Sequence, residues 1–218
     1  MAGAQAQTRL VPATPVRAVQ LDNPGQHQLT PPAQGQGIQQ LRHFAASTKA
    51  AAGRFVQTPL GGGQGTQGRA SGSFAFARPG RFRWAIEKPD PQLIVTDGQK
   101  LYFYDEGLKQ VTIRAADQAI QATPAAVLFG VGDLDSTFRL AEAQPYAGLA
   151  WVEAVPKSPD SGFERIRIGM RDGLPRIMEV VDAFGQVNRF EFSQLRTDGQ
   201  LPAGLFQFQV PAGVDVLQ

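Results

Sequence analysis

The segment 74–84, FAFARPGRFRW, combines the residue types that a nucleic-acid-binding surface requires. Three arginines alternate here with four bulky aromatic side chains, and single-stranded nucleic acids stack on aromatic rings beside cationic groups. Side chains alternate between the two faces of a strand. By this alternation, the aromatic side chains of each strand share one face: Phe74, Phe76, Phe82 and Trp84. Arg81 and Arg83 lie on the opposite face with Glu87, so the pattern argues against a nucleic-acid platform.

Arg78 differs from the two neighbouring arginines, because alternation places it with the phenylalanines at the end of its strand. A guanidinium at the rim of an apolar face needs acceptors for its five donors, or it loses solvation without compensation. Main-chain carbonyls at helix ends would suit it. A position at a turn, with the side chain reaching water, remains the alternative.

A glycine-rich stretch offers a nucleotide-binding pattern that its context contradicts. Gly63, Gly65 and Gly68 satisfy GxGxxG, but a dinucleotide fingerprint requires a strand before the glycines and a helix after them. A strand-like run follows instead, so the stretch is interpreted as a hairpin loop, and no cofactor is expected.

Residues for catalysis or metal binding are scarce. The chain has no cysteine and two histidines, His27 and His43, whereas metal centres and catalytic triads draw on such side chains. The nearest carboxylate pairs stand in turn-like segments, where they are better explained as caps and turn residues: Asp133 with Asp135, and Glu87 with Asp90. We therefore expect no catalytic residue, no metal site and no enzymatic activity.

The bulk composition also makes nucleic-acid binding improbable on electrostatic grounds. The 218 residues include 21 basic and 19 acidic side chains, and charged residues make up 18% of the chain, below the usual quarter. No apolar run reaches the roughly 18 residues of a transmembrane helix. The first residues lack the basic and apolar regions of an intact signal peptide, so a secreted location would imply a leader that is already removed.

The chain divides into a tail and a single domain. Residues 1–35 are rich in Pro, Gln and Ala and have too few apolar side chains to offset the entropy of ordering. We expect a flexible tail there and one domain over 36–218. Apolar residues three and four apart, with many alanines, predict a helix within 36–53, which Gly53 would end.

From Arg54 onward the apolar period is two, and turns rich in Gly, Pro and Asp separate the runs. The eleven predicted strands are 55–58, 70–77, 81–87, 92–97, 100–106, 109–115, 148–156, 163–170, 175–182, 188–195 and 205–210. Between the sixth and seventh, 116–143 predicts two or three short inserted helices, with Pro124 at a helix start. An antiparallel sheet of this size must curl or close, so the fold is predicted to be mainly β, of the α+β kind.

Apolar side chains repeat on one face of many strands, which predicts a large apolar surface. Besides the residues of 74–84 and Ile86, the pairs concerned are Tyr102 and Tyr104, Ile166 and Ile168, Phe190 and Phe192, and Phe206 and Phe208. Eleven strands enclose more room than side chains alone fill, so a hydrophobic cavity is expected. Val127, Leu128 and Phe129 would form the apolar underside of the inserted helices.

Four ordered motifs resemble the LolA family of periplasmic outer-membrane lipoprotein carriers. They are ARPGRFRW (77–84), KPDPQLIVTDGQKLYFYDEGLKQVT (88–112), ATPAAVLFG (122–130) and RDG (171–173). The likeness extends from about Gly37 to Val216. The long tail, and a C-terminus that lacks the further segment of some members, depart from the family and affect details of partner docking.

The resemblance implies an incomplete eleven-stranded antiparallel β-barrel, with a hydrophobic cavity covered by a lid of short helices. It implies a monomeric periplasmic chaperone for lipoprotein transport, which receives the acyl chains of lipoproteins from the inner-membrane Lol ABC transporter and delivers them to the outer-membrane receptor LolB. Arg78 would be the latch of the lid, and Phe82 and Trp84 would lie at the cavity mouth and wall.

Three alternatives remain open at this point. A LolB-like receptor should carry a lipid-anchored cysteine, which the given chain lacks. A lipid-binding stress-sensor domain would usually be joined to a second domain. A lipid hydrolase would need a nucleophile and a base, which the sequence does not display.

Overall fold

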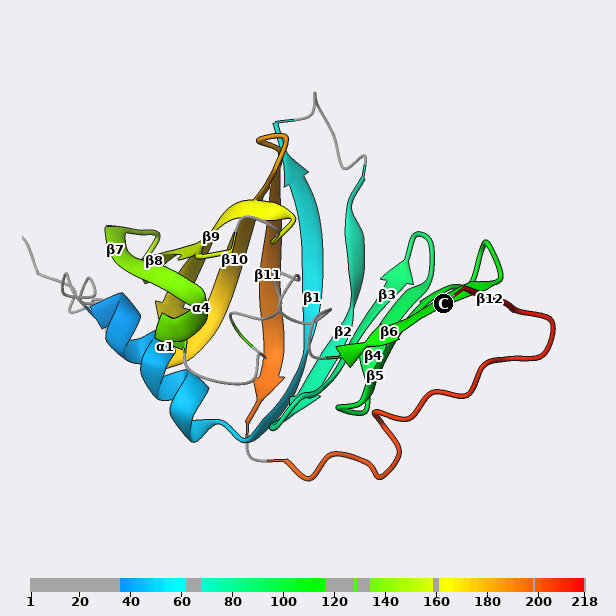
Figure 1. Ribbon diagram of the computed structural model, residues 1–218. Helices are drawn as coiled ribbons and strands as arrows, with labels where there is room; N and C mark the ends of the chain where they lie inside the picture. The colour runs from blue at the N-terminus through cyan, green and yellow to red at the C-terminus, as the bar shows by residue number, and fades with distance from the viewer. Residues whose placement is uncertain are drawn as a thin grey trace, which may run out of the picture.

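One strongly curved β-sheet forms the body of the protein in the computed structural model (Figure 1). The structure describes residues 36–61, 68–116, 128, 134–158, 161–197 and 199–217. Among the described elements, helix α1 comes first and the short helix α4 lies between β6 and β7. The elements are α1 (Gln36–Ser47), β1 (Ala50–Leu60), β2 (Ala70–Ala77), β3 (Arg81–Lys88), β4 (Gln92–Thr96), β5 (Lys100–Asp105), β6 (Gln110–Ala115), α4 (Leu134–Thr137), β7 (Phe138–Tyr146), β8 (Leu149–Pro156), β9 (Phe163–Arg171), β10 (Leu174–Asp182), β11 (Val187–Arg196) and β12 (Asp215–Leu217).

The sheet joins two antiparallel meanders side by side. Its strand order is β12-β6-β5-β4-β3-β2-β1-β11-β10-β9-β8-β7, so β1 pairs with β2 on one edge and with β11 on the other. β12 is parallel to β6, while every other ladder of the described strands is antiparallel. β12 and β7 stand at opposite ends of this order and do not pair, so the predicted mainly β, incompletely closed fold is confirmed.

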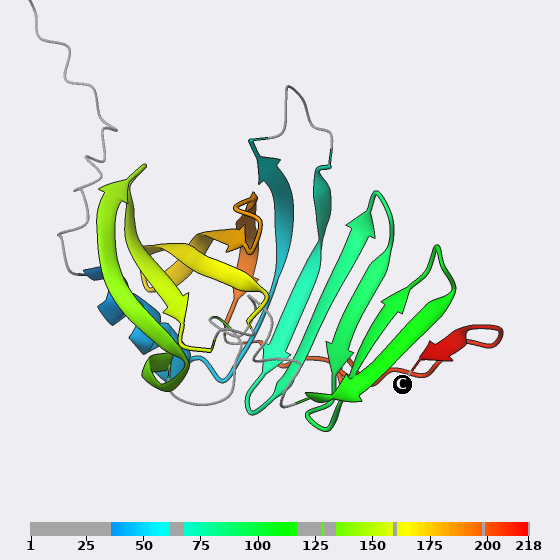
Figure 2. The same ribbon diagram turned by 45° about the horizontal axis from the view of Figure 1, so that its top comes forward.

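Helix α1 packs against the half of the sheet formed by β7–β10 (Figure 1). Leu41 and Phe44 are almost fully buried there, in one cluster with Val152, Ile166 and Ile168. Phe44 also meets the ring of Phe76 edge-on, with 6.1 Å between ring centroids. Figure 2 shows that the sheet is strongly curved and that strands β2–β6 splay apart in the half of the sheet away from α1. The helix therefore fills one half of the concave side.

The predicted helix ends earlier than Gly53. α1 stops at Ser47, and Ala50 begins β1, in which Ala50, Ala51 and Ala52 pair with residues of β2. Alanine favours helix locally, but pairing and burial within the sheet override this preference. Gly53 lies inside β1, where a Cβ atom would be 2.9 Å from the ring of Phe74. Glycine is thus required for close approach, not for ending a helix.

Two other parts of the secondary-structure prediction are wrong. Residues 138–143, expected to belong to the inserted helices, begin strand β7. Residues 205–210, expected to be a strand, form turns and irregular chain whose Phe206 is buried against Ala75 and Ala77. β7 replaces this segment among the eleven antiparallel strands. The predicted tail, 1–35, lies outside the described residues.

Candidate functional site

The strand register gathers the aromatic residues of several strands on the concave face. Phe74 stands opposite Trp84, and Phe76 opposite Phe82; the concave row continues from Trp84 through Ile94 to Phe103. On the other side of β1, Phe55 stands opposite Phe192. The concave face is therefore apolar across the junction of the two meanders.

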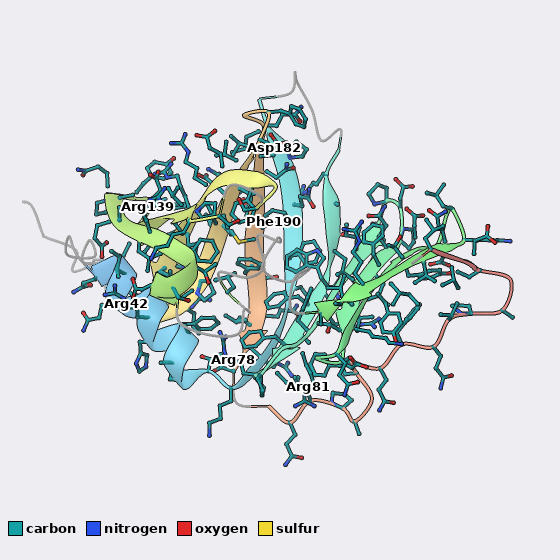
Figure 3. The ribbon with its side chains drawn as sticks, in the orientation of Figure 1. Arg42, Arg78, Arg81, Arg139, Asp182 and Phe190 are labelled. Atoms are coloured by element: carbon teal, nitrogen blue, oxygen red, sulfur yellow. The ribbon has the colours of Figure 1, made fainter. Side chains whose placement is uncertain are left out.

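Trp84 is the centre of an aromatic cluster on this face. The ring of Phe55 stacks on it at 3.9 Å between centroids, and those of Phe190 and Phe74 lie at 5.6 and 5.9 Å. Phe192 meets Phe74 edge-on at 5.4 Å. Figure 3 shows Phe190 pointing from β11 toward this cluster. Such pairs add about 0.5–1.5 kcal/mol each beyond area burial, so the floor of the concave face is firmly packed.

Arg78 stands at the end of β2, where the chain turns into β3. Its Nε donates to the carbonyl oxygen of Thr48 at 3.0 Å, and its Nη2 donates to the carbonyl oxygen of Leu128 at 2.8 Å. Its guanidinium carbon is 5.2 Å from the centroid of the Phe76 ring. Burial lowers the pKa of Arg78 from its ordinary value, as expected of a charged group taken from water. Arg78 thus bridges the main chain just after α1 and that of Leu128.

The other end of α1 is fastened to β7. The amides of Gly37 and Ile38 donate to the carboxylate of Glu142 at 3.2 and 2.8 Å, so this side chain satisfies two of the free N–H groups of the first helical turn. A Cβ atom on Gly37 would lie 2.8 Å from Val152. Glycine therefore permits the helix to approach the sheet closely.

A second polar contact joins α1 to α4. Arg42 donates to both carboxylate oxygens of Asp135, at 3.1 and 2.9 Å. The hydrogen bond from Arg42 holds the pKa of Asp135 below its usual range. Both side chains are about half exposed, so the pair orients α4 more than it stabilises the fold.

The structure positions most of the predicted cavity residues on the concave face. Phe74, Phe76, Phe82 and Trp84 are buried there, Ile86 is half-buried, and Leu128 is 1% exposed within the same core cluster. Val127 and Phe129 lie outside the described residues. Leu128 was predicted to line the cavity from its place in the apolar run AVLF, and the residues of β2 and β3 were predicted from strict alternation.

The register corrects the predicted position of Tyr102 and Tyr104. Tyr102 stands opposite Val95, and Val95 opposite Arg83, so both tyrosines lie on the convex face. Their rings pack against Phe208, at 5.4 and 5.5 Å between centroids. Leu101 and Phe103 occupy the concave positions instead. In KLYFYD (100–105) both faces of the strand carry large apolar or aromatic side chains, so the alternation alone could not show which face is concave.

The comparisons with known proteins decide the family. The family described as "Outer membrane lipoprotein carrier protein LolA" matches residues 46–209. The chain belongs to the LolA family. An outer-membrane lipoprotein carrier protein of Bordetella avium is 45% identical over 82% of this chain and 86% of that protein, and one of Bordetella pertussis is 47% identical over 83% and 85%. The resemblance inferred from the sequence motifs is thereby confirmed.

Solved structures support the fold. An uncharacterized conserved protein from Thermus thermophilus superposes with a TM-score of 0.51 at 11% sequence identity. The superposition covers 83% of this chain and 95% of that protein. At this identity the likeness concerns the fold alone.

The convex face of this LolA-family chain carries a C-terminal strap, residues 199–214, which leads into the edge strand β12. Phe206 is buried against Ala75 and Ala77, and the guanidinium carbon of Arg81 lies 5.6 Å from the centroid of the Phe206 ring. A pocket of about 450 Å³ separates part of the strap from the sheet, lined by Ala50, Ala77, Arg81, Asp97, Gly199, Gln200, Leu201, Pro202, Ala203, Gly204, Phe206 and Gln207. Figure 3 shows Arg78 and Arg81 at the same end of the sheet, with Arg81 beside the strap.

Sequence reasoning missed several residues that build the site. Thr48 contributes only a main-chain carbonyl, for which the side-chain pattern has no signal. Phe44 was expected only as part of a helix, and Phe55 only as part of a strand. Glu142 was assigned to helices, so its role as a cap for α1 depended on recognising β7.

The described residues hold no cluster of three or more His, Asp or Glu side chains arranged to bind a metal ion. In that same part of the chain, no helix is long and apolar enough to cross a membrane.

Proposed function

We propose that this chain carries lipoproteins across the periplasm. It would bind the acyl chains of lipoproteins that the inner-membrane Lol ABC transporter releases, and deliver them to the outer-membrane receptor LolB. The observation that carries the proposal is an apolar concave face bridged at its rim by Arg78. Binding and release are the whole function, without a chemical step.

The proposed acyl-binding surface is the concave face around Trp84. Phe74, Phe76, Phe82 and Ile86 contribute to it from the same two strands, and Leu128 faces it within the core cluster. Burying an acyl chain gains about 0.8 kcal/mol for each methylene group. Release into water would therefore be very slow, so delivery requires a receptor whose own cavity binds the chains more tightly.

Arg78 acts as the latch of the closed state. Its side chain holds two main-chain carbonyls, at Thr48 and Leu128, and incoming acyl chains must break at least the contact to Leu128 if this segment moves. Hydrogen bonds from a charged group are worth about 1.5–3 kcal/mol each. Because these bonds exist only in the closed state, they oppose loading and favour release, which keeps the two states within a few kcal/mol of each other.

The test compares wild-type protein with Arg78→Leu and with Arg83→Gln, whose side chain is on the convex face of the same hairpin. Each protein is loaded with lipoprotein from inner-membrane vesicles, and transfer to purified LolB is followed over time. We expect Arg78→Leu to retain its cargo at least about tenfold longer than wild type, because the loss of even one such bond, about 1.5 kcal/mol at the low end, implies that factor, while Arg83→Gln behaves as wild type.

The latch role of Arg78 and the carrier function can be refuted separately. Transfer by Arg78→Leu at the wild-type rate would refute the latch and leave the carrier function standing. Failure of the wild-type protein to take up any lipoprotein would refute the carrier function itself.

A further inference from the structure

Two largely apolar rows of the concave face reach polar side chains at strand β6. Along one row, Phe82 is followed by Thr96, Leu101 and finally Arg114. Along the next, Trp84 is followed by Ile94, Phe103, Thr112 and finally Leu217 of β12. β6 is the last antiparallel strand on this side of the sheet. The cation of Arg114 therefore stands at the outer end of its row, and the hydroxyl of Thr112 stands between Phe103 and Leu217 in the next.

The apolar surface leading to Arg114 is partly open to solvent. Phe103 is 36% exposed, an unusual state for a phenylalanine on the concave face, whereas Leu101, directly opposite Arg114, is buried. The side chain of Arg114 is exposed, and no ion pair involves it within the described part of the chain. A third row of the same face contains Gln92 and Asp105, and there the side-chain amide of Gln92 donates a hydrogen bond to the carboxylate of Asp105.

We propose that Arg114, with Thr112 beside it, binds the anionic head of an amphiphile whose chain lies on Trp84 and Phe103. A guanidinium presents several donors to a carboxylate or a phosphate, and the exposed Phe103 supplies apolar surface next to it. Neighbouring strands are about 4.8 Å apart, so about 14 Å of sheet separates β3 from β6. The head would lie on β6, next to the edge strand β12, and the chain would run inward toward the aromatic cluster.

This inference rests on the proposed function, because it assumes that acyl chains occupy the concave face. It adds an orientation and a preference: a ligand with an acidic head should bind better than a neutral one of the same chain length. The same preference would apply to an acidic group close to the lipid of a bound lipoprotein.

The test uses three ligands with equal chains: decanoate, decyl phosphate and decanol. Their binding at pH 8 is measured by calorimetry and by intrinsic tryptophan fluorescence, to which Trp84 contributes, for wild type, Arg114→Gln and the convex-face control Arg83→Gln. We expect Arg114→Gln to bind both anionic ligands about two- to fivefold more weakly, the range for a solvent-exposed charge pair. Its affinity for decanol should not change, and the difference should diminish at high salt.

Three outcomes would overturn the proposal. Arg114→Gln could bind the anionic ligands as tightly as wild type, Arg83→Gln could weaken them equally, or Arg114→Gln could weaken decanol by the same factor. The decanol measurement on wild type separates this inference from the function on which it rests. If wild type does not bind decanol at all, the acyl-binding surface itself is refuted.

Discussion

Replacing Gly72 with alanine should disturb the contact between β2 and β3 beneath the aromatic cluster. A Cβ atom at this position would overlap the carbonyl oxygen of Ala85 and lie 3.0 Å from the Phe55 ring. The first obstacle is main chain of the neighbouring strand, so it cannot be relieved by a rotamer change. The ladder is already irregular there, with a register shift between Ser71 and Gly72.

The expected magnitude follows from two opposing effects. Overpacking a well-packed site costs about 1–3 kcal/mol, and an overlap with main chain belongs at the upper end of that range. Replacing glycine by alanine regains about 0.4–1 kcal/mol by restricting the unfolded chain. We therefore expect a net loss of about 2–2.6 kcal/mol in the free energy of unfolding, or about 4–10 °C in Tm for a domain of this size.

The assay is urea unfolding followed by tryptophan fluorescence, since Trp84 stacks on Phe55 near the substitution. Gly199→Ala is the control, because a Cβ atom there would have no neighbour within 4 Å. A Gly72→Ala variant that unfolds at the wild-type urea concentration would refute the close approach of β2 and β3.

Three other substitutions test different contacts. Glu142→Ala should destabilise the start of α1 by about 1 kcal/mol, the usual value of a helix cap, and hydrogen exchange at Gly37 and Ile38 should accelerate; unchanged exchange would show that Glu142 does not cap the helix. Phe206→Ala should release the strap, so that proteases cleave it faster, and unaltered cleavage would contradict its role as an anchor. Glu87→Gln should cost less than about 1 kcal/mol at pH 7, because the pair with Arg54 is exposed. The hydrogen bond from Arg54 lowers the pKa of Glu87. The stabilisation by this pair is therefore present above the ordinary glutamate pKa and is lost as the pH falls through the lowered value. A stability difference between wild type and Glu87→Gln that persists in acid would refute this assignment.

Alternation and turn residues were sufficient to locate most strands, because a half-buried strand places an apolar side chain on its buried face at every second residue. They failed where long-range packing decides. Residues 50–52 have a helical composition yet pair with β2, and 205–210 alternates as a strand would, yet covers the convex face as part of the strap.

The candidate site was predictable to a similar extent. Alternation placed Arg78 on the apolar face and indicated that it needs carbonyl acceptors, but only the folded chain identifies those of Thr48 and Leu128. For Tyr102 and Phe103, adjacent apolar residues made both faces equally plausible. The choice depended on pairing with β4, which no local pattern specifies.

The junction between β1 and β11 has a consequence for folding. The Gln57 side chain donates to that of Asn188 across this junction, 131 residues away in sequence. Closing so long a loop costs entropy before the contact forms, and folding is slower when such contacts dominate. The hairpins of each meander should therefore form first, and the junction should form late. Until β11 arrives, β1 presents an unpaired edge along much of its length, so an incomplete chain that ends before β11 should be prone to aggregation through that edge.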